Sequence, residues 1–223
     1  MEAGRRRRSG SRGRQTEAAE NDHLVLEATR TLVATRGADV SVAAIAEVAG
    51  VGVGTLYRRY STKEALLQHL CVAAMDQVIE AAKQGLDNED PWGGLVSYVE
   101  SCVNHRTGVL APLAGTIEVS PEMMRTAQRS ADITERLVDR ARRAPGALRR
   151  DVASLDISLL IEVLSRRTIN MPTEEDENAR RRLLAVALEG LRAKPGLTAL
   201  PGRAPDRKRY ERRWLTDSST QAK

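Results

Sequence analysis

The side chains that most often perform catalysis or bind metals are few and widely separated in this chain of 223 residues. His23, His69 and His105 lie far apart, and Cys71 and Cys102 form no C-x-x-C motif. The sequence also has no H-E-x-x-H, G-x-S-x-G or G-x-x-x-x-G-K-[ST] motif, which would supply zinc ligands, a serine nucleophile or a phosphate-binding loop. We therefore expect no metal site, no cofactor and no enzymatic activity.

Arginine, whose positive charge favours contact with anions, is concentrated near the N-terminus. Residues 1–14 contain one glutamate and six arginines: Arg5, Arg6, Arg7, Arg8, Arg12 and Arg14. This segment and residues 194–223 each have a net charge of +5, whereas residues 15–193 have −5. Two basic ends have two interpretations: they contact a polyanionic partner, or they are simply solvated tails. The charge alone does not decide between these interpretations.

Nothing in the hydropathy pattern indicates export or membrane insertion. The run Arg5–Arg8 is followed by Gly, Ser, Arg and Gln rather than by the apolar stretch of a signal peptide. No stretch approaches about 18 uninterrupted apolar residues, the length that would predict a membrane span. Two cysteines do not make a disulfide framework, so we expect a cytoplasmic protein with no membrane partner.

The elements that position these side chains are expected to be helices. Phe is absent, and a core built from Ala, Val, Leu and Ile favours helices packed on helices. Capping residues begin several segments: Asn21 or Asp22, Ser41, Ser61 with Glu64, Asp90, Ser120 and Ser154. Helical spacing of apolar residues predicts helices at about 22–36, 42–49, 53–59, 61–84, 90–105, 109–117, 121–143, 154–166 and 173–193, with a short basic helix at 206–214 as an option. No strand is expected, so the fold class is all-α.

Two of these helices have the spacing of a helix-turn-helix. Val42 begins the motif, the small residue Ala46 lets the two helices approach, and Gly50 supplies the left-handed turn between them. Leu56 then packs the second helix on the first. Taken alone, this spacing is moderately specific, because short helical pairs with a Gly turn also occur in unrelated helical proteins.

Residues 41–67 make the assignment specific. Their sequence, SVAAIAEVAGVGVGTLYRRYSTKEALL, closely resembles the N-terminal domain of the TetR family of bacterial transcriptional regulators. The resemblance covers residues 21–70 in detail and implies a two-domain protein. The expected parts are a basic disordered arm (1–20), a three-helix helix-turn-helix DNA-binding domain (21–68, motif about 41–60), a six-helix effector-binding and dimerisation domain (69–193) and a basic flexible tail (194–223).

The resemblance implies that helix 53–59 enters the major groove of DNA. It assigns Thr55 to a base or a phosphate, the Tyr57 hydroxyl to a phosphate, and Lys63 to a phosphate near the start of the next helix. The complete DNA-binding set is Ser41, Val53, Thr55, Tyr57, Arg58, Arg59 and Lys63. Gly52 departs from the family, which often has a hydroxyl residue at the start of this helix, so one phosphate contact is lost.

The N-terminal arginines have an expected role beside this domain. Residues 15–70 contain five basic and seven acidic residues, so the domain has little positive field of its own. We hypothesise that the six arginines between Arg5 and Arg14 compensate by following the DNA backbone or entering the minor groove, as homeodomain arms do.

In the second domain the resemblance implies a dimer interface and a ligand pocket. The last two predicted helices would pair with their copies through Ile157, Leu160, Leu164, Leu184, Leu188 and Leu191, although the same residues could be internal core. The pocket would lie among helices 63–84, 90–105 and 121–143, and its candidates are Met75, Trp92, Tyr98, Cys102, His105, Met123 and Met124. For each candidate, core packing is the plainer interpretation.

These implications combine into a sequence-specific, homodimeric transcriptional regulator bound to a palindromic double-stranded operator. The family default is a repressor released by a small-molecule effector, whose binding moves helix 63–84 and changes the spacing of the two DNA-binding domains. A transcriptional activator of the same fold and a redox sensor that uses Cys71 or Cys102 remain open. An all-helical enzyme or lipid carrier with an incidental helix-turn-helix is disfavoured by the match over residues 41–67.

Overall fold

The fold is helical throughout the described residues, which are 5–167 and 171–215 of a computed structural model, with side chains from residue 21 onward. In chain order the elements are α1 (Arg5–Arg36), the 3₁₀ turn η1 (Gly37–Asp39), α2 (Val42–Ala49), α3 (Val53–Arg59), α4 (Lys63–Asp87), α5 (Pro91–Asn104), the 3₁₀ segment η2 (Thr107–Leu113), α6 (Pro121–Arg143), α7 (Ser154–Leu164), α8 (Thr173–Leu191) and α9 (Arg207–Arg212). Those ranges hold one isolated bridge, Leu148 to Arg192, and no strand, so the all-α prediction is confirmed. None of these helices is long and apolar enough to cross a membrane.

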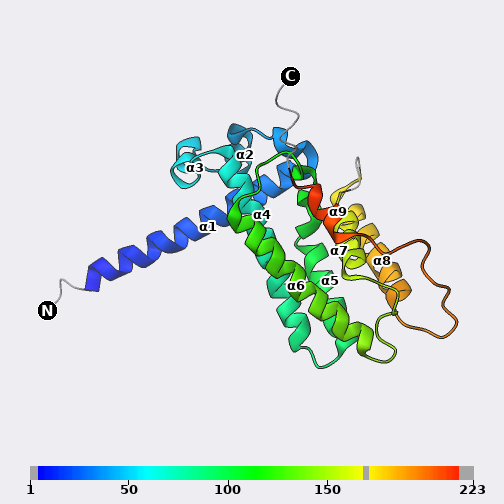
Figure 1. Cartoon of the computed structure of the whole chain (residues 1–223). Coiled ribbons are helices and arrows are strands. Elements are labelled where there is room, and N and C mark those ends of the chain that lie inside the picture. Colours follow the sequence, from blue (N-terminus) through cyan, green and yellow to red (C-terminus); the bar gives the residue numbers. More distant parts are fainter. Residues whose placement is uncertain (1–4, 168–170, 216–223) are drawn as a thin grey trace, which may run out of the picture.

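Figure 1 shows two parts of the molecule. We call α1–α3 the head and α4–α9 the body. The long helix α4 leaves the head and runs the length of the body, where α5 and α6 lie along it. α7 packs against α5, α6 and η2, and α8 and α9 lie beside α7.

Most predicted helix starts agree with the structure because their capping groups are in place. The Ser41 hydroxyl accepts a hydrogen bond from the Ala44 N–H, which satisfies a free donor at the start of α2. Asp90 and Ser120 cap α5 and α6 in the same way, and each is followed by a proline whose fixed φ suits the first helical position.

Two predicted caps were wrong by one residue. Thr62, not Ser61, caps α4, and the Glu64 carboxylate accepts from the Glu118 N–H instead of closing a capping box. In α7 the cap position is Ala153, and the Asp156 carboxylate accepts from its N–H. At α4, two residues of similar capping ability, Ser61 and Thr62, compete. At α7, the Ser154 hydroxyl donates to the Glu135 carboxylate instead of capping, so the Asp156 carboxylate satisfies the Ala153 N–H.

α1 begins sixteen residues earlier than its expected cap, at Arg5 instead of Asn21 or Asp22. The structure therefore differs from the disordered arm expected over residues 5–20. Arg, Gln, Glu and Ala are strong helix formers, so a helix that is already anchored by its C-terminal half extends through them despite Gly10 and Gly13. Figure 1 shows the N-terminal half of α1 extending away from the other helices.

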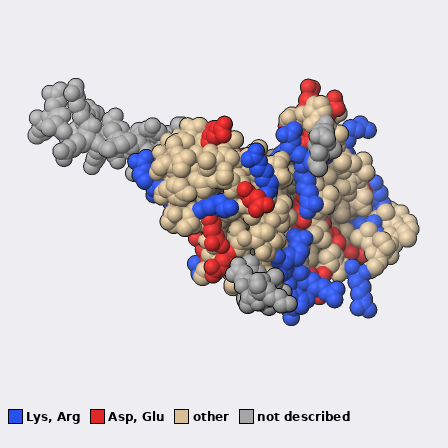
Figure 2. Space-filling view, turned by 90° about the horizontal axis from the view of Figure 1, so that it is seen from above, with Lys and Arg blue, Asp and Glu red and all other residues tan. Residues whose placement is uncertain are grey.

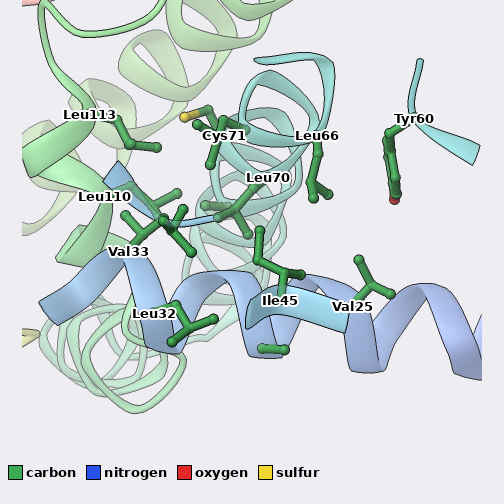
Figure 3. Close-up of a cluster of buried hydrophobic side chains, with 14 of the residues drawn as sticks. Val25, Leu32, Val33, Ile45, Tyr60, Leu66, Leu70, Cys71, Leu110 and Leu113 are labelled. Carbon is green, nitrogen blue, oxygen red and sulfur yellow. The ribbon is translucent and has the colours of Figure 1, made fainter. Parts of the chain in front are cut away.

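The head and the upper body share one hydrophobic core. Figure 3 shows Val25, Leu32 and Val33 of α1 facing Leu66 and Leu70 of α4, with Leu110 and Leu113 of η2 closing one side. Ile45 of α2 and Tyr60, which follows α3, complete the cluster. Because the same side chains hold head and body together, a shift of α4 must be felt in the head.

A second core lies lower in the body among α4–α8, and two glycines bring its first helices together. A Cβ atom added at Gly94 of α5 would lie 2.1 Å from the backbone oxygen of Gly85 in α4, so only glycine fits. Gly108 of η2 makes a similar approach, since its added Cβ would lie 2.5 Å from the Cα of Glu162 in α7. These contacts fix where α7 stands relative to η2.

Candidate DNA interface and ligand cavity

The turn between α2 and α3 has the geometry that the helix-turn-helix spacing requires. Gly50 is left-handed, with φ of +67°, a conformation that glycine adopts without steric cost. The Val51 N–H then donates to the Ala46 oxygen at 3.0 Å, and buried Leu56 packs α3 against the core. The turn therefore presents the opposite side of α3 to solvent.

The outward face of α3 carries hydroxyl, aromatic and guanidinium groups. Val53, Thr55, Tyr57 and Arg58 are all exposed, and Tyr57 keeps 51% of its surface open. The Arg58 guanidinium donates to the Thr55 hydroxyl at 3.0 Å, which holds both side chains on one turn of the helix. Ser41 is exposed as well, although its hydroxyl already caps α2.

Lys63 lies at the first position of α4, as the sequence predicted, but it is partly buried. Its ammonium donates to the backbone oxygen of Ala38, in the connection between α1 and α2, at 2.9 Å. An ammonium has three donors, so this bond fixes the side chain and leaves two N–H groups for another acceptor.

Arg59 differs from its neighbours because it is tied to α1. Its guanidinium donates two hydrogen bonds to the Asp22 carboxylate, each 2.9 Å long, and the Tyr60 hydroxyl donates to the same carboxylate. We call these three residues the head clamp. Asp22 was expected to cap α1, but it lies inside that helix and joins it to the end of α3.

The electrostatics of the head clamp favour the paired form. Burial alone would raise the pKa of the Asp22 carboxyl, but the hydrogen bonds from Arg59 and Tyr60 lower it below its ordinary value. Burial, together with the Asp22 carboxylate, raises the pKa of Tyr60 to about 12. At neutral pH the clamp is therefore an ionised carboxylate held by a charged and a neutral donor.

On the face seen from above (Figure 2), the described side chains of the head form no continuous basic surface. In Figure 2, which views the molecule from above, the left lobe that carries α2 and α3 is mostly tan, with a few Lys and Arg at its edges. The arginines proposed to compensate, Arg5, Arg6, Arg7, Arg8, Arg12 and Arg14, lie where side chains are not described. Their contact with DNA stays a prediction.

A cavity of about 730 Å³ opens in the body among α4, η2, α6, α7 and α9. Four of the predicted pocket residues line it: Met75, Tyr98, Met123 and Met124. The other three do not. Trp92, at the start of α5, lies under the Arg192 guanidinium. Cys102 is buried in the second core, and His105 is the residue at which α5 ends.

The wall formed by α6 explains a further difference from the sequence. Helical spacing places Met124, Ala127 and Ala131 on one apolar side of this helix, but Met124 and Ala127 are exposed and Ala131 is half-buried, and all three line the cavity. Helical periodicity identifies an apolar face, but it does not distinguish a face packed on another helix from one that borders a cavity.

The C-terminal segment closes one side of this cavity. Its lining includes residues of α9 and, shortly after that helix, Trp214 and Leu215. We call residues 207–215 the lid. Trp214 also packs against the core shared by head and body.

The lid is attached to α7 through one buried carboxylate. Glu162 accepts hydrogen bonds from the Tyr210 hydroxyl at 3.2 Å and from the Arg213 guanidinium at 3.0 Å. Arg166 of the following turn donates to its other oxygen at 3.0 Å. We call Glu162, Tyr210 and Arg213 the lid clamp. The Glu162 side chain is only 8% exposed, and burial with the nearby carboxylate raises the pKa of Tyr210 to about 12.

The segment that leads to the lid is also attached, which differs from the flexible tail expected over residues 194–223. Arg149 donates to the Thr198 oxygen at 2.7 Å, and the Asp151 carboxylate accepts from the Leu200 N–H at 2.8 Å. The short basic helix suggested at 206–214 is present as α9, with Asp206 as its cap. Residues 216–223 lie outside the described part of the chain.

The six residues predicted for a dimer interface lie mainly inside the body. Ile157, Leu164, Leu184 and Leu188 are buried in the second core, and Leu160 and Leu191 pack against it. The alternative that these residues are internal core is therefore the one that matches the structure. The apolar residues that α7 and α8 expose are Val163, Leu183 and Val186.

Neither cysteine has the surroundings of a reactive thiol. Burial raises the pKa of Cys71 and of Cys102 to about 12, so both are protonated at neutral pH. The two cysteines differ in their surroundings: Cys71 borders the cavity and Cys102 does not. In the residues whose structure is described, no three His, Cys, Asp or Glu side chains gather as metal ligands would.

Known proteins match both halves of the chain. Residues 25–70 match the family model for bacterial regulatory proteins of the tetR family, and residues 90–193 match the model for the C-terminal domain of SbtR-like transcriptional regulators. No curated protein sequence matches the chain.

Solved structures share the fold at low sequence identity. A TetR transcription regulatory protein from Mycobacterium vanbaalenii has a TM-score of 0.56 and 24% identity, with 80% of this chain and 99% of that one covered. The regulator SCO0520 from Streptomyces coelicolor has a TM-score of 0.55 and 22% identity, over 78% and 99% of the two chains. The ketosteroid transcriptional regulator KstR2 of Mycobacterium tuberculosis has a TM-score of 0.55 and 20% identity, with 78% of this chain and 95% of that one covered. With the helix-turn-helix geometry and the two family models together, the chain belongs to the TetR family of bacterial transcriptional regulators.

Proposed function

We propose that this protein is a cytoplasmic repressor that binds a palindromic operator as a homodimer and leaves it when a small molecule enters the cavity. It acts by binding and performs no chemical reaction. The observation that carries the proposal is the connection between the two sites. Cys71 and Met123 belong both to the core under the head and to the cavity wall.

The DNA-binding surface is the outward face of α3 together with the start of α4. Tyr57 and Arg58 are exposed and can donate hydrogen bonds to phosphates or bases. Lys63, at the start of α4, has two ammonium N–H groups that the bond to Ala38 does not use. Val53 offers an apolar surface to a thymine methyl group, and Thr55 offers a hydroxyl. Arg59 is assigned a different role, because the head clamp already uses its guanidinium to orient α3.

The proposed dimer surface is the exposed side of α7 and α8. Val163, Leu183 and Val186 are apolar and open to solvent, and Val186 keeps 71% of its surface exposed. Leu183 and Val186 lie three residues apart and so share one side of α8. A two-fold axis through this side pairs each helix with its copy and places two heads on a symmetric operator.

Coupling between the sites runs along α4. This helix begins at Lys63, lines the cavity with Cys71, Ala74 and Met75, and donates from Gln68 to the Glu118 oxygen before α6. Arg30 of α1 donates to the His105 oxygen at 2.5 Å and to Gln77 of α4 at 3.0 Å. A ligand that favours a different position of α4 therefore changes the placement of the head.

The experiment that tests the DNA-binding surface compares two tyrosines that each lose only a hydroxyl. Tyr57→Phe should weaken operator binding by about fivefold per half-site, because one phosphate hydrogen bond is lost. Tyr210→Phe, on the lid, should leave the effector-free affinity unchanged. Lys63→Ala should lower the slope of affinity against salt by about one per half-site. Equal affinities for Tyr57→Phe and the wild type in fluorescence anisotropy would contradict this surface.

A further inference from the structure

The cavity can hold the body of an apolar ligand. Its wall along α4, η2 and α6 is formed largely by Met, Ala, Val and Leu side chains: Ala74, Met75, Val78, Leu110, Ala111, Val119, Met123, Met124, Ala127 and Ala131. A volume of about 730 Å³ lies in the range of pockets that enclose a small organic molecule. The wall therefore selects for an apolar chain or ring system.

The buried polar groups of the cavity are already paired with one another. Both oxygens of Glu162 accept hydrogen bonds from the protein's own donors, Arg166, Tyr210 and Arg213. The Tyr98 hydroxyl pairs with the Thr134 hydroxyl at 3.2 Å. A cationic ligand would have to displace one of the protein's own arginines to reach the Glu162 carboxylate, and the other acid of the wall, Glu211, is exposed and pairs with Arg207.

The lid, in contrast, brings positive charge to the cavity. Residues 206–213 include five Lys or Arg and two acids, and Lys208 and Arg212 both line the cavity. Glu211 pairs with Arg207 at 3.8 Å, and Glu162 is occupied by Arg213. Within the described residues, no carboxylate lies within 4.0 Å of the charged group of Lys208 or Arg212, and Asp206 attracts Arg212 only from further away.

We propose that the effector is an anionic amphiphile, an apolar chain or ring body with one acidic group such as a carboxylate. The body lies against the α4, η2 and α6 wall, and the acid pairs with Lys208 and Arg212 of the lid. This inference rests on the proposed function and deepens it by naming the effector's chemical class. It also gives the basic C-terminal segment a role, because the lid both closes the cavity and recognises the charge.

The test measures binding of three twelve-carbon probes to the full chain: laurate, 1-dodecanol and dodecylamine, each below its micelle concentration. Binding is followed by the fluorescence of Trp214 in the Trp92→Phe variant, since Trp214 lines the cavity and Trp92 does not. Laurate should bind at least tenfold more tightly than either other probe. In Lys208→Ala/Arg212→Ala that preference should disappear while the 1-dodecanol affinity stays the same. The matched control, Lys83→Ala/Arg129→Ala, removes two cations outside the cavity and should retain the preference.

Three results overturn the inference. Equal binding of laurate and 1-dodecanol means that the acid is not recognised, and tighter binding of dodecylamine means that Glu162 selects the ligand instead. Binding of none of the three means that the cavity does not hold amphiphiles. Operator binding is measured separately without any probe, so a protein that binds its operator but not laurate contradicts this inference alone. A protein that prefers laurate but binds no specific DNA contradicts the proposed function alone.

Discussion

The head clamp and the lid clamp are built from the same three kinds of side chain. In each, one carboxylate accepts hydrogen bonds from an arginine and from a tyrosine. Asp22 holds Arg59 and Tyr60 in the head, and Glu162 holds Tyr210 and Arg213 in the body. Each clamp joins two segments that are distant in the chain.

The clamps differ in what lies behind them. Tyr60 is buried in the core of the head, and its ring lies 5.5 Å from that of His69. Glu162 and Tyr210 border a cavity instead. A clamp on a filled core fixes its segment because release would expose packed apolar surface, whereas a clamp beside a cavity can open with a smaller loss. The same polar chemistry therefore holds α3 against α1 in one place and the lid against α7 in the other.

The largest effect is expected when the head clamp is broken. Asp22→Ala leaves Arg59 and Tyr60 without their acceptor, so the free energy of unfolding should fall by about 1–3 kcal/mol. Operator affinity should fall at least tenfold because α3 loses its orientation, while laurate binding should be unchanged. Chemical denaturation and fluorescence anisotropy measure these quantities. Glu47→Ala removes an exposed acid from the same head and serves as the control; if both variants behave alike, the clamp does not orient α3.

Breaking the lid clamp should have a local effect. Glu162→Gln removes the charge that holds Arg213, so trypsin should cleave within residues 207–213 several times faster than in the wild type. Operator affinity without effector should stay within about twofold, since the head clamp is intact. Mass spectrometry of the early fragments identifies the sites, and Glu122→Gln on exposed α6 is the matched control. Unchanged cleavage of the lid would show that Glu162 does not hold it closed.

The cysteines give a smaller effect that separates the cavity from the core. Because the pKa of each thiol is about 12, both should react slowly with N-ethylmaleimide at pH 8. Cys71 should react faster in Glu162→Gln and be protected by laurate, because it borders the cavity, whereas Cys102 should stay unmodified. Peptide mapping distinguishes the two sites. Rapid labelling of Cys102, or loss of operator binding on mild oxidation that a Cys→Ser variant prevents, would favour the redox-sensing alternative.

The smallest effect concerns alkaline pH. A tyrosine whose pKa rises on folding from about 10 to about 12 stabilises the protein fully below pH 10, and this contribution is lost as the pH rises through 12. Between pH 9 and pH 11.5, Trp214 fluorescence in Trp92→Phe should therefore report opening of the lid. Tyr210→Phe should flatten this change and Tyr60→Phe should not. The reverse result would assign the transition to the head.

The sequence predicted features that depend on local spacing. Ser41, Gly50 and Leu56 act within a few residues of one another, and the structure has each in its expected role. The clamps escaped prediction because they join residues far apart, such as Asp22 with Arg59 and Glu162 with Arg213. In the sequence Asp22 looks like a helix cap and Glu162 like an ordinary helix residue, and only the tertiary fold brings their partners to them.

α8 shows why helical spacing alone does not identify a dimer surface. Leu184 and Leu188 form one apolar side, and Leu183 and Val186 form another. Helical spacing identifies both but does not reveal which side faces the second core. Packing of the whole body buries the first side and leaves the second exposed, which is why we propose the second as the dimer surface.

The most direct test of the account is selection of binding sites by the full protein from a random double-stranded DNA library. We expect enrichment of one palindromic sequence with two half-sites, loss of that enrichment in Tyr57→Ala, and release of the selected DNA by laurate but not by 1-dodecanol. Enrichment of a single half-site, or of no sequence at all, would contradict it.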